Sequence, residues 1–270
     1  MIEQLRKLAF DMADKLHISE LQDWTSASAS FLRNGNVSML KQLCTNSLSP
    51  ILKETEGKDP QAKVLNGYMN ALEKVVDDLN TCRGVSILQG KNMNSFNKYS
   101  SQLKEVMITP MKPLIEQIKS SFENFRPSED IMNGYFAAKW CLDHQLYQQS
   151  LTILHENIVS HICESEKLDI AEEEDREIIN KGFSVINKRL ENKKDKWKCT
   201  EEQKMRIEKL LNNEWLNALA STFLVTTTLR NDYNHAGMRE NPMSRSRLIA
   251  NLKERLDIIF QKLKEKGLCS

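Results

Sequence analysis

The side chains that could do chemistry are concentrated in one short stretch, Leu229-Arg230-Asn231-Asp232-Tyr233-Asn234-His235-Ala236-Gly237. Histidine is the side-chain type whose ordinary pKa lies near neutrality, so His235 is the candidate acid or base. Arg230 carries a permanent charge on a forked guanidinium, which suits a phosphate group. Asn231 and Asn234 can orient His235 or the backbone through hydrogen bonds. Asp232 either positions Arg230 or faces solvent.

This set of side chains suits cleavage of an RNA phosphodiester without a metal ion. The 2′-hydroxyl can attack its adjacent phosphate when a base removes its proton and an acid protonates the 5′-oxygen. A cation stabilises the charge that develops in the transition state. Ordinary ion pairs and helix caps use the same residue types, so the spacing alone leaves a structural role open.

The spacing of the stretch restricts its geometry if it lies on a helix. Asn231 and His235 are four residues apart and share one face, while Arg230 and Asn234 share another. Arg230 and His235 are five apart and diverge by roughly 140°. Both can reach one phosphate if the helix ends between them, if Arg230 bends across, or if a second subunit completes the site. Gly237 suits a helix end, and a two-fold dimer would bring two copies together.

The elements that must position this stretch are predicted to be helices. Nine glycines and six prolines are few for 270 residues, which disfavours strand-and-turn folds. Hydrophobic residues recur at helical spacing over residues 2–17, 61–83, 215–233 and 244–266, whereas residues 84–95 predict a loop. No stretch alternates with period two, and no phosphate-binding glycine loop occurs. We therefore predict an all-α helical bundle, with an N-terminal helical region at residues 1–126 and a second region at residues 127–270 that holds the stretch.

Helix boundaries follow from capping residues and breakers. Ser19 with Gln22 and Thr200 with Gln203 predict capping boxes, and Ser128 predicts another helix start. The dipeptide Ser49-Pro50 predicts a break, and Ser244 is expected to cap the final helix.

Charge and cysteine content bound the partners and the compartment. The net charge of +1 gives no general attraction to nucleic acid or membrane, but the segment after Arg230 is basic. Arg239, Arg245 and Arg247 are therefore candidate RNA contacts. The six cysteines form no C-x-x-C pair, which argues against a zinc site, and no metal site is expected. No apolar run approaches the ~20 residues of a membrane span and no signal peptide is visible, so a reducing, cytoplasmic location is predicted.

The histidines of the second region are weaker candidates. His144, His155 and His161 lie in or beside one helical segment, but their spacing does not make an H-E-x-x-H metal site. Ordinary core or surface positions are the better interpretation of all three.

The segment Arg230 to His235 resembles the R-x4-6-H motif of HEPN-domain ribonucleases, in which a polar residue, often asparagine, follows the arginine. The fuller string Leu229 to Gly237 is similar to CRISPR-associated HEPN effectors of type III systems. The run Ala137-Ala138-Lys139-Trp140-Cys141-Leu142-Asp143-His144, followed by Gln148-Gln149 and Leu154, resembles a helix pair upstream of that motif. The resemblance covers about residues 128–266.

The resemblance implies a HEPN-type bundle, a homodimer with a composite site at its interface, and metal-independent cleavage of single-stranded RNA without a cofactor. Arg230 and His235 would be the catalytic pair, Asn231 would complete it, and Asp232 and Asn234 would support it. Such relatives usually carry an N-terminal CARF sensor domain of α/β fold that binds cyclic oligoadenylate. This chain has no βαβ pattern, so a sensor would lie outside it. Two alternatives stay open: a silent HEPN scaffold for dimerisation or RNA binding, and a HEPN toxin paired with a nucleotidyltransferase antitoxin.

Overall fold

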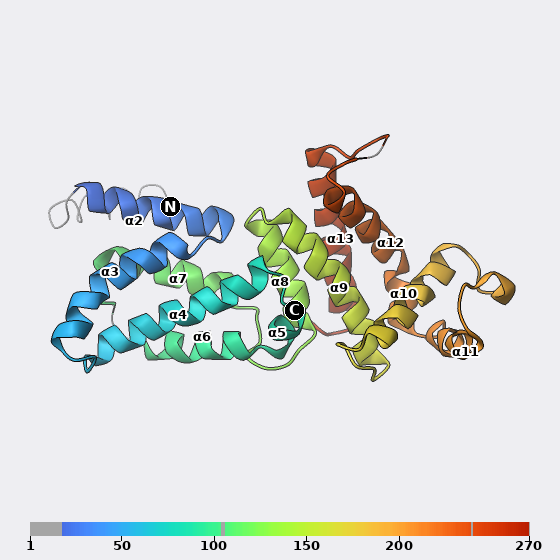
Figure 1. Ribbon diagram of the computed structural model, residues 1–270, viewed down its shortest axis with the longest axis horizontal. Coiled ribbons are helices and arrows are strands. Elements are labelled where there is room, and N and C mark those ends of the chain that lie inside the picture. Colours follow the sequence, from blue (N-terminus) through green and yellow to red (C-terminus); the bar gives the residue numbers. More distant parts are fainter. Residues whose placement is uncertain (1–17, 104–105, 239, 270) are drawn as a thin grey trace. The chain divides into compact units, whose positions relative to one another are not determined.

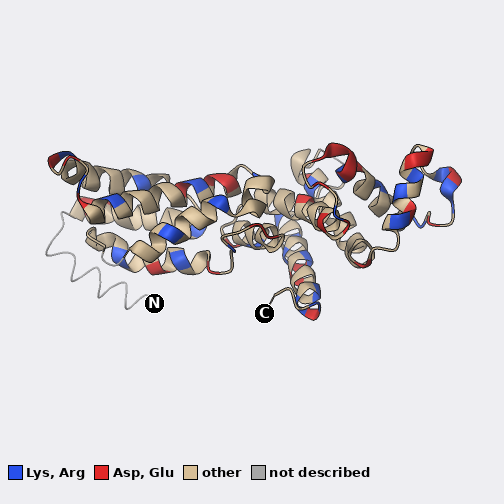
Figure 2. Ribbon diagram, turned by 90° about the horizontal axis from the view of Figure 1, so that it is seen from below, with Lys and Arg blue, Asp and Glu red and all other residues tan. Residues whose placement is uncertain are grey.

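The computed structural model describes residues 18–103, 106–238 and 240–269. Within these ranges every regular element is a helix, which confirms the expected all-α class (Figure 1). The helix predicted over residues 2–17 lies outside the described residues. Basic and acidic residues are distributed along most of the helices (Figure 2). No helix in the described part of the chain is long and apolar enough to cross a membrane.

The chain divides into two compact units. The first unit contains Met1–Thr81, Gln89–Glu129 and Asp143–Gln145, and the second contains Cys82–Leu88, Asp130–Leu142 and Leu146–Ser270. The main change from one unit to the other therefore falls between residues 129 and 130. Two short segments are exceptions: Cys82–Leu88 belongs to the second unit, and Asp143–Gln145 belongs to the first.

The first unit is organised around one long helix. Its helices are α2 (Ile18–Asn34), α3 (Ser38–Glu54), α4 (Pro60–Asn80), α6 (Lys91–Gln102), η1 (Thr109–Met111) and α7 (Lys112–Ser121). Helix α4 packs against α3 and α6, with Leu65, Leu72 and Leu79 among its buried residues. Its N-terminus is stabilised because Asp59 caps it, accepting a hydrogen bond of 2.7 Å from the backbone N–H of Ala62, and because Pro60 occupies the first turn.

The loop predicted over residues 84–95 is wrong. Helices α5 (Gly84–Gln89) and α6 cover this segment, separated by Gly90. Gly90 adopts a φ of +66°, and a Cβ there would lie 2.8 Å from the carbonyl oxygen of Arg126. Its neighbours Ile87, Leu88 and Met93 are buried, and burial of these side chains stabilises helices on both sides of the glycine.

Three expected boundaries are also wrong. Pro50 lies inside α3 rather than ending a helix, and Ser19 lies within α2 rather than capping it. Helix α8 begins at Met132, four residues after Ser128, and at its start the Oδ1 of Asp130 accepts a 2.8 Å hydrogen bond from the N–H of Met132. Aspartate and serine both cap helices well, and residue type alone did not separate them.

The second unit holds the stretch in a layer of packed helices. Its helices are most of α5, together with α8 (Met132–Asp143), α9 (Tyr147–Ser165), α10 (Glu173–Asn187), η2 (Lys194–Lys196), α11 (Glu201–Leu210), α12 (Glu214–Asn234) and α13 (Arg245–Glu265). Helix α12 packs against α9, α10 and α13 (Figure 1). The capping box of Thr200 with Gln203 and the cap at Ser244 are both present, as predicted.

An aromatic stack joins three helices of the second unit. The ring of Phe223 on α12 lies 4.1 Å from that of Phe183 on α10, with an interplanar angle of 13°. On α9, His155 stacks on Phe223 at 4.5 Å. Six residues further along α9, nearly two turns away, His161 contacts the ring of Trp215 at 4.4 Å and its Nδ1 lies 2.8 Å from the hydroxyl of Tyr135. This stack fixes α12 against α9 over the length that leads to the polar stretch.

Candidate functional site

The polar stretch forms the C-terminal turn of α12. Helix α12 ends at Asn234, but the N–H of His235 still donates to the carbonyl of Asn231 at 3.0 Å. His235 therefore continues the helical rotation, and the chain turns away only at Ala236 and Gly237, whose φ values are +52° and +67°. Arg230 and His235 accordingly stay on diverging faces of one chain, because the helix does not end between them.

Exposure separates the members of the stretch into two groups. Asn231, Asn234 and His235 are exposed, whereas Arg230 is half-buried and Asp232 is only 4% exposed. The exposed members are placed where a large substrate or a second protein could reach them.

Asp232 holds the turn that follows the helix. Its Oδ2 accepts a 3.2 Å hydrogen bond from the N–H of Met243, and its carbonyl accepts a 2.9 Å bond from the N–H of Gly237. The side chain therefore neither faces solvent nor pairs with Arg230. Its contacts join the end of α12 to the start of α13.

Arg230 pairs with a glutamate on another helix that the sequence pattern did not connect with it. Its Nη1 lies 3.1 Å from Oε1 of Glu156 on α9. The other carboxylate oxygen of Glu156 accepts a 2.7 Å hydrogen bond from Arg176 on α10. The Nε of Arg230 is buried and has no hydrogen-bond partner among the described residues. One carboxylate thus connects two arginines from different helices.

The N-terminal end of α9 also meets the stretch. Gln148 donates a 3.3 Å hydrogen bond to the side-chain oxygen of Asn234. The neighbouring Tyr147 lies under the guanidinium of Arg245, 5.5 Å from ring centroid to Cζ, a distance at which a cation and an aromatic face attract. These contacts bring the first turns of α9 and α13 beside the end of α12.

The basic residues after the stretch are only partly described. Arg239 lies outside the described residues. Arg245 and Arg247 are exposed in the first turn of α13. Arg247 lines an open cavity of about 580 Å³, whose other lining residues are Thr228, Glu240, Asn241, Pro242, Met243 and Ser244. This hollow borders the exposed end of α12, so a polymer that reaches His235 could also contact Arg247.

The remaining histidines of the described residues are buried. His144 and His155 are each 7% exposed and His161 is 4% exposed, so none of them is open to a large substrate. Burial lowers the pKa of His161 to about 4. Burial also lowers the pKa of His155, and the nearby Arg230 and Arg176 add to this effect while Glu156 opposes it. His235 is therefore the one exposed histidine in the described part of the chain.

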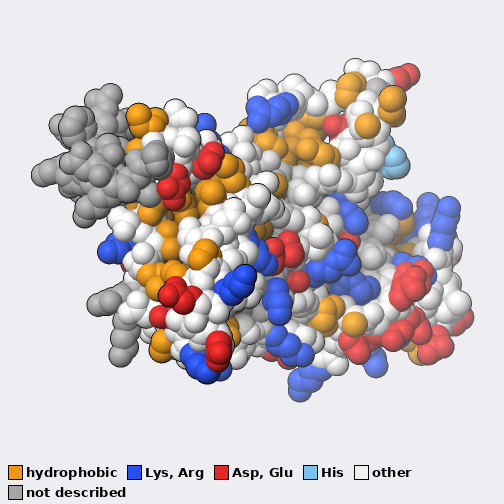
Figure 3. Space-filling view, turned by 60° about the vertical axis from the view of Figure 1, so that its left-hand side comes forward, with side chains coloured by type: hydrophobic (Ala, Val, Ile, Leu, Met, Phe, Trp, Pro, Cys, Tyr) orange, Lys and Arg blue, Asp and Glu red, His pale blue; other side chains and the backbone are white. Residues whose placement is uncertain are grey.

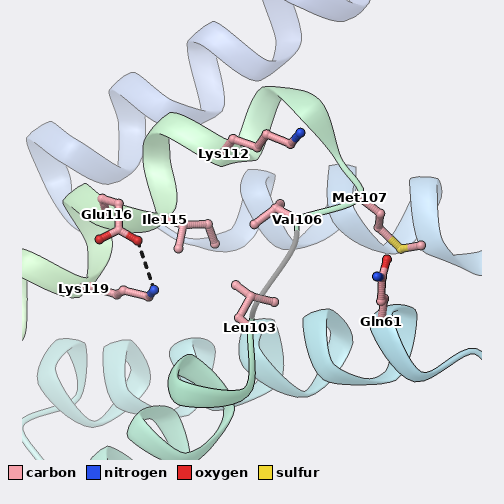
Figure 4. A pocket seen from close by; sticks show the side chains of 8 residues that line it. All are labelled: Gln61, Leu103, Val106, Met107, Lys112, Ile115, Glu116 and Lys119. Carbon is pink, nitrogen blue, oxygen red and sulfur yellow. Dashed lines mark hydrogen bonds and ion pairs between the residues drawn. The ribbon is translucent and has the colours of Figure 1, made fainter.

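A second cavity, of about 560 Å³, lies in the first unit. Leu103, Val106 and Ile115 form its apolar side, with the ion pair of Glu116 and Lys119 at 3.0 Å beside them (Figure 4). Leu103 and Val106 flank residues that are not described, and the charged groups of the ion pair satisfy each other. This cavity gathers no set of acid, base and cation comparable with the end of α12.

The surface mixes hydrophobic, acidic and basic side chains. Figure 3 shows hydrophobic side chains reaching the surface at several places, with Lys and Arg close to Asp and Glu over much of the same face.

Comparison of the chain with models of protein families, with curated proteins and with solved structures found no match.

Proposed function

We propose that this protein is an endoribonuclease that cleaves single-stranded RNA by attack of the 2′-hydroxyl on the adjacent phosphate, in CRISPR antiviral defence. Arg230, His235 and Asn231 form its catalytic set, and the site is shared between the HEPN motifs of a homodimer. The observation that carries the proposal is the end of α12, where an exposed histidine and asparagine stand beside a half-buried arginine that a carboxylate holds in place.

The chemistry assigns a role to each side chain. His235 exchanges a proton with the attacking 2′-hydroxyl or the leaving 5′-oxygen. Arg230 stabilises the charge on the phosphate as it becomes pentacoordinate. Asn231 lies one turn before His235 on the same face, where its amide can hydrogen-bond the phosphate or the histidine.

The exposed face of α12 supports a dimeric site. Beyond the first turn, where Glu214 is exposed and pairs with Lys266, one set of exposed residues follows alternating steps of four and three residues and carries no formal charge: Asn217, Ser221, Leu224, Thr228, Asn231 and, at the helix end, His235. Such spacing is typical of a seam along which two helices pack. Leu224 is 49% exposed, although it sits in the middle of this seam. Two copies of α12 paired here would place two histidines and two arginines around one RNA strand, which offsets their divergence within one chain.

The first turn of α13 supplies further contacts in this proposal. Arg245 and Arg247, together with Arg239, would bind phosphates on either side of the cleaved bond. A CARF sensor for cyclic oligoadenylate would act from outside this chain.

The test is cleavage of an unstructured, end-labelled RNA in EDTA. We expect the wild-type protein to cut it and to leave cyclic-phosphate or 3′-phosphate ends. Arg230→Ala and His235→Ala should each reduce the rate by about 10²–10⁴-fold, the usual contribution of a positioned acid, base or charge. Arg206→Ala is the matched control. Arg206 on α11 also pairs with a carboxylate, that of Glu174 on α10, at a distance of 3.1 Å. Full activity in either motif variant would contradict the assignment.

One observation favours a second candidate, a catalytically silent scaffold that binds RNA. Glu156 already pairs with the charge of Arg230. A scaffold would bind labelled RNA without cutting it, and His235→Ala would leave binding unchanged. The same EDTA experiment, read on a native gel as well as a denaturing one, separates the two functions.

A further inference from the structure

We propose that Glu156, held by Arg176, is a positioning residue that fixes the guanidinium of Arg230 for catalysis. The proposal rests on the ribonuclease function above and adds to it a residue pair that lies outside the R-x4-6-H motif. Its basis is a chain of contacts from α10 through α9 to α12 within the second unit.

Arg176 is the fixed end of this chain. Its Nη1 donates to Oγ of Ser160 and to the carbonyl of Ile170, each at 2.9 Å. Its Nη2 donates to the carbonyl of Glu156 at 3.1 Å and to Oε2 of the same residue at 2.7 Å. Four acceptors on two sides of the guanidinium leave Arg176 little freedom, and it grips both the backbone and the side chain of Glu156.

Glu156, whose position Arg176 fixes, in turn restrains the guanidinium of Arg230. With Oε2 occupied by Arg176, Oε1 faces Nη1 of Arg230 at 3.1 Å. Arginine has several rotatable bonds, and an unrestrained guanidinium near the end of a helix would sample many orientations. The carboxylate restricts these orientations. The Arg230 side chain remains 31% exposed, so part of it stays open to a substrate.

The charge balance favours positioning over blocking. Two guanidinium groups and one carboxylate leave the cluster of Arg176, Glu156 and Arg230 with one positive charge, so it still attracts a phosphate. Arg176 already satisfies one oxygen of Glu156, which weakens the hold of that carboxylate on Arg230. A carboxylate that blocked the site would instead have to be displaced by the substrate.

The experiment is a double-mutant cycle on RNA cleavage. The wild type, Glu156→Gln, Arg230→Ala and the double variant are compared for kcat and KM on a short fluorescent RNA. We expect Glu156→Gln to lower kcat by about 10–100-fold with KM changed by less than about threefold, as for a misplaced catalytic group. In the Arg230→Ala background the same change should have no further effect, because Glu156 acts through Arg230.

Glu174→Gln is the matched control, since Glu174 pairs with Arg206 at 3.1 Å away from the motif. It should leave kcat unchanged. Glu156→Gln has nearly the shape of the native residue, and Arg176 keeps its bonds to Ser160, Ile170 and the backbone, so the variant should fold. Thermal unfolding of each variant checks this. If Glu156→Gln unfolds, Arg176→Lys takes its place in the cycle, because it loosens Glu156 without touching Arg230.

The outcomes separate the two proposals. A wild type that cuts no RNA contradicts the ribonuclease function and the role of Glu156 together. A wild type that cuts RNA while Glu156→Gln keeps its full kcat contradicts only the positioning role. A higher kcat in Glu156→Gln would show that the carboxylate blocks Arg230. An equal loss from Glu156→Gln with and without Arg230 would show a merely structural contribution.

Discussion

Helices α4 and α12 have the same length, 21 residues each, yet their side chains are used in opposite ways. Every buried residue of α4 is nonpolar or aromatic, and it packs inside the first unit. Helix α12 buries Thr222, Thr226 and Asp232 among its apolar residues, while Leu224 and Tyr233 are exposed. A helix built only to stabilise its own unit does the reverse. This difference is what the proposed function requires, because it leaves apolar side chains of α12 at the surface for a partner or a substrate.

The largest expected effect separates activity from stability at the end of α12. His235→Ala should reduce RNA cleavage by about 10²–10⁴-fold. Because His235 is exposed and makes no side-chain hydrogen bond with the described residues, the free energy of unfolding should change by less than about 0.5 kcal/mol. Cleavage rates and urea unfolding of the same sample measure both quantities. A large loss of stability would mean that His235 supports the fold instead.

The opposite result is expected in α4. Leu72 is fully buried, so Leu72→Ala should lower the free energy of unfolding by about 2–5 kcal/mol through lost burial and a cavity. Urea unfolding monitored by circular dichroism measures this change. RNA cleavage at a temperature where the variant stays folded should be nearly normal. A selective loss of cleavage in the folded variant would break the contrast between the two helices.

Acid should destabilise the helices around α12 through two buried histidines. The pKa of His161 in the folded chain is about 4, below the value of about 6.5 in an unfolded chain. The unfolded chain therefore binds the proton more readily, so this contribution is complete above about pH 6.5 and is lost as the pH falls toward 4. The loss is on the order of 3 kcal/mol for His161, and burial of His155 adds to it in the same direction.

Unfolding free energies between pH 4 and pH 7 test this prediction. His161→Gln keeps a side chain that can hydrogen-bond Tyr135 but cannot be protonated. In this variant the unfolding free energy should depend less steeply on pH, by the slope that corresponds to about one proton taken up on unfolding. An unchanged slope in His161→Gln would mean that other groups cause the acid effect.

The smallest expected effect concerns the exposed seam. Leu224→Glu places a charge on each copy of α12, directly opposite its equivalent in a two-fold pair. We expect the dimer to dissociate at least about tenfold more readily, since like charges across a helix seam repel. Sedimentation velocity over a range of concentrations measures the dissociation. Leu32→Glu is the control, because Leu32 is 41% exposed on α2 of the first unit. An equal effect of both changes would remove the case for pairing along α12.

Sequence reasoning succeeded where the physical signal is local. Helices α4, α12 and α13 follow from side chains repeated every three or four residues, and the caps at Thr200 and Ser244 follow from residue type. The loop predicted around Gly90 is wrong, because it rests on the preference of glycine and asparagine for loops. Burial of Ile87 and Met93 outweighs those weak local preferences, and burial depends on contacts with distant parts of the chain.

The residues of the candidate site also divide into those that the local sequence predicts and those that it does not. The polar members at the end of α12 are adjacent in sequence, so their spacing could be interpreted directly. Glu156 and Arg176 could not be found this way, because they come from other helices and neither lies in a recognisable pattern. Only the packing of α9 and α10 against α12 brings them to Arg230.

The bond from Asp232 to the backbone of Met243 has a practical consequence for genetic screens. A saturation scan scored by loss of RNA cleavage would rank Asp232 beside His235, although the aspartate would fail by releasing the loop that precedes α13. Asp232→Asn retains an oxygen that can accept the same bond, and it should score near wild type if the role is mechanical. Inactive variants made for trapping an RNA complex should therefore alter His235, since a change at Asp232 would disturb the surface that the RNA is meant to occupy.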